Sequence, residues 1–190
     1  QMSEVPRIGQ LISRFALTHQ TNADSGSNQL ASRSDRNSPV LPDRILAFEH
    51  NRKYLTQTQT QLQQAGVDHL VNLVYAPLQE FNFNDQKYLY YDCDGTLEQA
   101  SRLLQKDRAK ILVLVDGPPG STNQHARYPA MLVMLNWFGV HEMHFILDDY
   151  NRDEEKEIVA MWRQNLDQRA LSYEEEQLNL EKGAYFMRIK

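Results

Sequence analysis

The sequence is poor in cysteine, in positive charge and in long apolar runs. A single cysteine among 190 residues, Cys93, excludes an internal disulfide and a metal site built from several thiolates. The formal charge of −5 disfavours binding to a phosphate backbone, so no nucleic acid partner is expected. No apolar run is long enough to cross a bilayer and no signal-peptide pattern is present, so we expect a cytoplasmic protein without a membrane partner.

What is present is an ordered series of apolar segments that predicts one α/β domain over residues 1–190. Residues 1–43 hold an amphipathic helix at 8–19 and then a polar, loop-like segment. Residues 44–190 alternate between strand-like and helix-like patterns with short links, which is typical of a doubly wound, mostly parallel sheet. The last two segments, 171–180 and 184–189, predict an antiparallel strand pair at the C-terminus.

The run "ILVLVD" at residues 111–116 contains five branched aliphatic residues without polar alternation, and it predicts a strand buried on both faces. The residues Gly117-Pro118-Pro119-Gly120 follow directly. Proline cannot donate a ladder hydrogen bond, so the chain leaves the sheet at Asp116. In open α/β sheets the carboxyl ends of the strands are where ligands bind. The alternative is a turn that begins with aspartate.

Three predicted strands end in carboxylates, namely Glu49, Asp116 and the pair Asp148–Asp149. If these strands are parallel, the carboxylates lie along one edge of the sheet. An acid after the second strand, about twenty residues beyond a glycine turn, is how such folds hold a ribose diol. Residues 23–28 are the only candidate for that turn, and they would use Asp24, Gly26 and Asn28. The alternative is an ordinary loop rich in Asp and Asn.

The segments "ILAFEHNRKYL", "ILVLVDGPPGSTNQHARYPAM" and "FILDDYNRDEEKEIVAMW" resemble class I S-adenosylmethionine-dependent methyltransferases. The likeness covers residues 44–166. It is closest to a small bacterial group with Glu-His after the second strand and Val-Asp-Gly-Pro-Pro-Gly after the fourth. The resemblance implies a Rossmann-like methyltransferase fold with S-adenosylmethionine as cofactor. It also implies that Glu49 binds the ribose hydroxyls and that the loop at Asp24, Gly26 and Asn28 lies under the methionine moiety.

Further residues complete the predicted cofactor-binding set. His50 follows Glu49 and could contact the adenosine or act as a base, although a half-exposed histidine without a role is the alternative. Ala76 and Asp116 stand at the ends of the next two predicted strands and are also assigned to cofactor binding.

Methyl transfer from a sulfonium is an in-line displacement, and a hydroxyl acceptor must also lose its proton. Asp116 and Asp148 are therefore predicted to be catalytic, in methyl transfer to a small-molecule acceptor such as an O-methylation. The placement of Asp116, Asp148 and Asp149 also resembles that of catechol-type O-methyltransferases, whose carboxylates hold Mg²⁺. The alternative for Asp149 is capping of the helix that begins near Arg152.

Residues after the Gly-Pro-Pro-Gly turn could line an acceptor pocket. His125 is predicted to be catalytic, and Arg127 could receive an anionic group of the substrate. The alternative is a surface loop in front of a helix that begins at Tyr128–Pro129. The charged run at residues 152–157 is interpreted as a solvated first helical turn.

Two further functions remain open. The polar region before residue 44 favours a methyltransferase-like domain that has lost catalysis and serves as a binding or assembly module. A nucleotide-dependent oxidoreductase would also use an acid after the second strand, but it would need a fuller glycine turn. The sequence leaves the oligomeric state open, and it is compatible with an oligomer.

Overall fold

The computed structural model describes residues 45–104 and 108–190, and these residues belong to one compact unit. The predicted helix at 8–19 and the loop with Asp24, Gly26 and Asn28 lie outside the described residues, so they stay predictions. In the described part of the chain, no helix combines the length and the apolarity that a membrane span requires.

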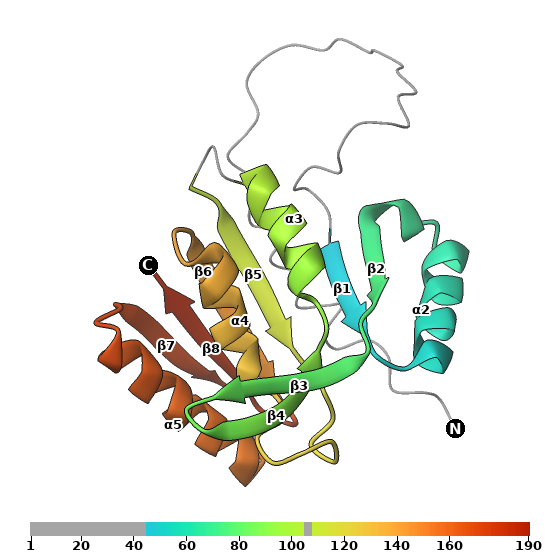
Figure 1. Ribbon diagram of the computed structural model, residues 1–190. Coiled ribbons are helices and arrows are strands. Elements are labelled where there is room, and N and C mark those ends of the chain that lie inside the picture. Colours follow the sequence, from blue (N-terminus) through green and yellow to red (C-terminus); the bar gives the residue numbers. More distant parts are fainter. Residues whose placement is uncertain (1–44, 105–107) are drawn as a thin grey trace. The chain divides into compact units, whose positions relative to one another are not determined.

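Strands and helices alternate along most of the described chain (Figure 1). The elements in order are β1 (Ile45–Glu49), α2 (Arg52–Gln64), the 3₁₀ turn η2 (Asp68–Leu70), β2 (Val71–Tyr75), β3 (Leu78–Phe83), β4 (Gln86–Tyr91), α3 (Asp94–Leu104), β5 (Lys110–Val115), α4 (Pro129–Phe138), β6 (Glu142–Asp148), α5 (Asp153–Gln168), β7 (Tyr173–Leu178) and β8 (Ala184–Ile189).

The described strands form three sheets. β1 pairs in parallel with β2, β3 pairs antiparallel with β4, and the third sheet has the order β5-β6-β8-β7. In that sheet β5 and β6 are parallel and are joined through α4, whereas β8 runs antiparallel to β6 and β7. The predicted α/β class and the antiparallel C-terminal pair are confirmed. One edge of β1 and one edge of β5 have no strand partner among the described residues.

The prediction that residues 111–116 are buried on both faces is wrong for one face. Ile111, Val113 and Val115 pack into the core, but Leu112 and Leu114 are 41% and 37% exposed. Cross-strand register places Leu112 beside His144 and Leu114 beside Ile146, on the face that the core does not use. An aliphatic run without alternation cannot reveal this, since both faces have the same residue types.

The core is built by α4 and α5 against the alternate residues of β5, β6 and β8. Trp162 of α5 is fully buried, and its indole ring lies 5.8 Å from the ring of Phe145 in β6. The indole Nε1 donates to the carbonyl of Tyr128 at 2.9 Å, just before α4. Trp162 therefore joins both helices to the sheet through packing and through a buried hydrogen bond.

Local residues set the boundaries of β1, α2 and the β3–β4 hairpin. The side chain of Asn51 accepts from the Lys53 N–H and caps α2, and Gly66 follows that helix with φ of 69°, as expected for a glycine after a helix end. Asn84 and Asp85 both have positive φ, which two-residue hairpin turns require. This pair is the sequence signal for the hairpin and so for β3, a strand that is absent from the predicted series.

Replacing Trp162 with alanine is expected to lower the free energy of unfolding by about 3–5 kcal/mol, because it opens a cavity and leaves a buried carbonyl unpaired. Urea titration followed by far-UV circular dichroism measures this loss. Trp137→Ala is the matched control, since Trp137 is only partly buried and donates to Asp94 at 2.8 Å. Equal losses in the two variants would contradict the central position of Trp162.

Candidate functional site

Glu49 ends β1 in a position fixed by its own backbone neighbours. Its Oε1 accepts from the Asn51 N–H at 2.7 Å, and its carbonyl accepts from the Ala76 N–H at 2.9 Å. No described residue donates to Oε2 of Glu49. The side chain of Glu49 is 25% exposed, so one carboxylate oxygen remains available to a ligand.

His50 and Ala76 lie beside Glu49, as adjacent parallel strands require. Nδ1 of His50 is 3.3 Å from Oε1 of Glu49, and the His50 ring lies 5.9 Å from the ring of Tyr91. Ala76 is fully buried, so only its backbone could contribute to a binding site. The assignments of His50 and Ala76 to cofactor binding stay predictions.

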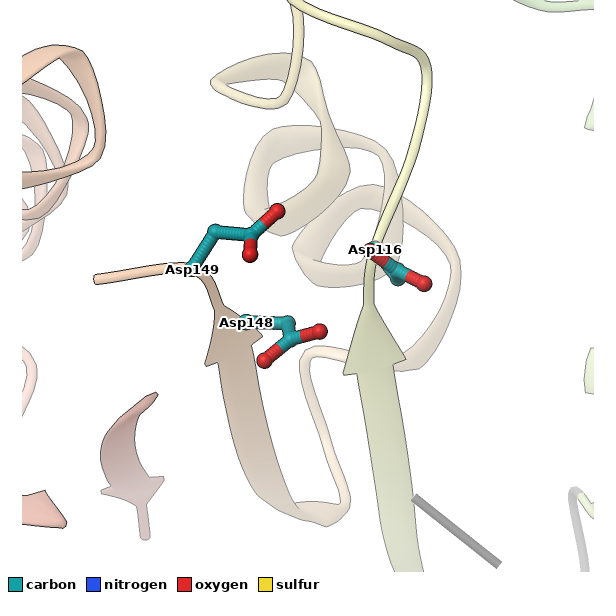
Figure 2. A group of neighbouring side chains, drawn as sticks. All are labelled: Asp116, Asp148 and Asp149. Carbon is teal, nitrogen blue, oxygen red and sulfur yellow. The ribbon is translucent and has the colours of Figure 1, made fainter. Parts of the chain in front are cut away.

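Three carboxylates gather at the carboxyl ends of β5 and β6. Asp116 directly follows β5, Asp148 ends β6, and Asp149 follows with a positive φ of 59°. Figure 2 shows the three side chains around the ends of the two neighbouring strands. Each offers one oxygen atom, and these atoms lie within 4.8 Å of one another. The parallel pairing of β5 and β6 accounts for the convergence, because it brings both carboxyl ends to the same edge.

Arg127 is the positive charge that holds this cluster. It is only 4% exposed, and its Nη1 donates to the carbonyl of Asp148 at 3.0 Å. Its Nη2 lies 3.4 Å from carboxylate oxygens of both Asp116 and Asp149, and its Nη1 lies 3.2 Å from Oε1 of Glu155. The interpretation of Arg127 as a receiver of substrate anions is therefore wrong, since its guanidinium is buried among the protein's own acids.

Two predictions about the start of α5 are also wrong. Asp149 does not cap the helix, because the capping position is Arg152, and no side-chain cap is present. Asp149 instead accepts from Arg152 at 2.9 Å and lies beside Arg127. The charged run is not wholly solvated either, since Glu155 is 2% exposed. A helix buries one side, and Glu155 falls on the side that faces Arg127.

The acids at this edge differ from exposed carboxylates in their titration. Desolvation raises the pKa of Asp116; Arg127 opposes this rise, and the charges of Asp148 and Asp149 add to it. Desolvation also raises the pKa of Glu155, against the lowering effects of Arg127 and Arg152. A carboxylate with a raised pKa holds a proton more readily, which suits Asp116 to proton transfer.

His125 follows the Gly-Pro-Pro-Gly turn and contacts two acids of α5. Its backbone N–H donates to Glu154 at 2.5 Å, and its ring Nε2 lies 2.6 Å from Oε2 of Glu157. Both partners belong to the first turns of α5. The ring of His125 therefore fastens the turn to α5, and its predicted catalytic role stays a prediction.

The structure brings Asp116, Asp148 and Asp149 together. Tyr91 lies near both this group and Glu49. The Tyr91 ring lies 5.9 Å from the ring of His50, which follows β1, and its hydroxyl lies against Gly117, just after β5. Tyr91 and Glu155 are not among the site residues that the sequence predicts. Tyr91 stands among several aromatic residues with nothing to distinguish it, and Glu155 was hidden in a run of charges.

Replacing Arg127 with methionine is expected to cost about 3–5 kcal/mol of stability at pH 7, because Asp149 and Glu155 lose their buried counter-charge. Arg127 lowers the pKa of Glu155, so its removal raises that pKa further in the folded state. A group whose pKa is higher in the folded state gains stability as it is protonated. The difference from the native chain should therefore shrink as the pH falls below 7, which urea titrations across pH measure.

Arg152→Met is the matched control for Arg127→Met. Arg152 contacts the same two acids, at 2.9 Å to Asp149 and 3.7 Å to Glu155, but its side chain is 55% exposed. Its loss should cost about 1 kcal/mol or less. A cost as large as that of Arg127→Met, or a cost for Arg127→Met that does not change with pH, would contradict the role of Arg127.

Comparison with known proteins finds solved structures that resemble this chain at low sequence identity. No family model and no curated protein matches the sequence. Among solved structures, the human methyltransferase 10 domain containing protein is 10% identical, with a TM-score of 0.47 over 77% of this chain and 59% of that one. An SAH-bound methyltransferase of Podospora anserina is 13% identical, with a TM-score of 0.48 over 77% of this chain and 61% of that one.

An rRNA methylase from Streptococcus thermophilus is 17% identical, with a TM-score of 0.40 over 77% of this chain and 75% of that one. The chain thus spans less than two thirds of the length of the human and Podospora proteins. At these identities and TM-scores the likeness does not assign the chain to a family.

Proposed function

We propose that this chain binds S-adenosylmethionine and transfers its methyl group to a small-molecule acceptor. The observation that carries the proposal is the arrangement of Glu49 and Asp116. Glu49 ends β1 and Asp116 directly follows β5, in two different sheets. The ring of Tyr91 nevertheless lies 5.9 Å from the ring of His50, next to Glu49. The Tyr91 hydroxyl lies against Gly117, next to Asp116. Acids at the carboxyl ends of strands are how open α/β folds bind nucleotide cofactors. The sequence resemblance over residues 44–166 supports the same reading.

Each acid then has a distinct task. Glu49 accepts hydrogen bonds from the ribose hydroxyls through its free oxygen, while Oε1 stays on the Asn51 N–H. Asp116 is half exposed, and its raised pKa makes it a better proton acceptor than an ordinary aspartate for a hydroxyl group of the methyl acceptor. Asp148 contributes negative charge beside Asp116, and its backbone carbonyl anchors Arg127. Bound cofactor supplies the electrophilic methyl group.

A magnesium ion at Asp116, Asp148 and Asp149 is not part of this proposal. Their oxygen atoms are close enough, but Asp149 is bound by Arg152 and lies beside Arg127, which also approaches Asp116. Mg²⁺ prefers carboxylates that are free to complete an octahedral shell. Guanidinium groups already balance two of these three acids, so the donor set fits a metal poorly.

The second candidate is a binding or assembly module that keeps the fold without catalysis. It is favoured by the polar sequence before residue 44, where the glycine turn of a cofactor site is expected. The two candidates differ in one measurable property, because only the first requires saturable binding of S-adenosylmethionine.

Glu49→Gln is expected to weaken the binding of S-adenosylhomocysteine by roughly tenfold or more, because a neutral amide replaces a charged acceptor. Isothermal titration calorimetry measures the dissociation constant. Glutamine keeps an oxygen for the Asn51 N–H, so the fold should be retained. Glu98→Gln is the matched control, since Glu98 lies on the exposed side of α3 and pairs with Arg102.

The native chain should bind S-adenosylhomocysteine saturably, and Glu98→Gln should bind as the native chain does. An absence of binding by the native chain at millimolar ligand would reject the methyltransferase proposal in favour of the binding module. Equal affinities for Glu49→Gln and Glu98→Gln would remove Glu49 from the site.

A further inference from the structure

Tyr91 is the last residue of β4, and it stands between the ends of β1 and β5. Its ring lies 5.9 Å from the ring of His50, next to Glu49, with an angle of 52° between the planes. It also makes an edge contact with the ring of Tyr90, at 5.2 Å between the ring centroids. These contacts hold the direction of the side chain, so the hydroxyl has a defined position.

That position is directly over Gly117, the residue after Asp116. A Cβ atom added to Gly117 would lie 2.2 Å from the Tyr91 hydroxyl oxygen and 3.4 Å from Cζ. Gly117 has no positive φ, so its backbone does not demand glycine. The absence of a side chain at Gly117 therefore makes room for the Tyr91 hydroxyl, which no described residue binds through a hydrogen bond.

The hydroxyl adds what the nearby acids lack. An ionised carboxylate such as Glu49 only accepts hydrogen bonds, whereas each hydroxyl of a ribose diol both donates and accepts. Burial and the charges of Glu49 and Asp116 raise the pKa of Tyr91 to about 12, so the phenol keeps its proton at neutral pH. It can thus donate beside Glu49.

We propose that Tyr91 is a ligand-contacting residue, whose hydroxyl donates a hydrogen bond to the ribose of the nucleoside held by Glu49. The inference rests on the proposed function and deepens it. It makes the site selective for ligands that carry an oxygen atom at that point of the sugar. Gly117 contributes to the same site, because a side chain at this position would overlap the Tyr91 hydroxyl.

The first experiment tests the position of the hydroxyl without any ligand. Gly117→Ala should lower the melting temperature of the native chain by about 2–10 °C, because the added methyl overlaps the hydroxyl oxygen. In a Tyr91→Phe background the same substitution should cost clearly less, since the nearest ring atom is then 3.4 Å away. An equal cost in both backgrounds would overturn the inference, because the hydroxyl would then lie elsewhere.

The second experiment measures S-adenosylhomocysteine binding by calorimetry for the native chain, Tyr91→Phe and the control Tyr90→Phe. Tyr91→Phe should bind about three- to tenfold more weakly through the loss of one hydrogen bond, and Tyr90→Phe should match the native chain. Native-like binding by Tyr91→Phe overturns the inference alone and leaves the proposed function standing. Failure of the native chain to bind overturns the proposed function, and the role of Tyr91 with it.

Discussion

The carboxylates at the carboxyl ends of β5 and β6, together with Glu155, form an acidic edge. The ion pairs of this edge with the buried guanidinium of Arg127 are the interaction on which its structure depends. Asp116, Asp149 and Glu155 come from three segments, and each has Arg127 within 3.4 Å. Carboxylates left so close without a counter-charge would repel one another or take up protons. Because Arg127 is itself buried, its field is screened weakly by solvent. One side chain thereby keeps the carboxyl ends of β5 and β6 charged and in place.

The Glu49 carboxylate at the carboxyl end of β1 is held by a different kind of interaction. Glu49 uses Oε1 on the Asn51 N–H, and Asn51 in turn caps α2 through the Lys53 N–H. The start of the helix and the direction of the carboxylate are therefore set by the same three residues. Such local hydrogen bonds orient one oxygen without neutralising it, whereas Arg127 neutralises its partners. The proposed roles, ligand binding at Glu49 and proton transfer at Asp116, use this difference.

Much of this arrangement follows from the sequence, since the strand-end acids and the α/β alternation depend on neighbours along the chain. The convergence of Asp116 with Asp148 follows once β5 and β6 are parallel. Other features depend on contacts between distant residues and could not be predicted. The burial of Glu155 requires knowing which side of α5 faces Arg127, and the exposure of Leu112 requires knowing which face of β5 is covered. The position of Tyr91 depends on a glycine 26 residues away in the sequence.

The remaining charge at the acidic edge has a consequence for a sulfonium ligand. Five carboxylates, those of Asp116, Asp148, Asp149, Glu154 and Glu155, stand against the three cations Arg127, Arg152 and Lys182. The excess is negative when all are ionised, and the charges of Asp148 and Asp149 add to the desolvation that raises the pKa of Asp116. A negative edge attracts a cationic methyl donor more strongly than the neutral thioether that remains after transfer. The same charges that hold the site together would therefore favour exchange of product for donor.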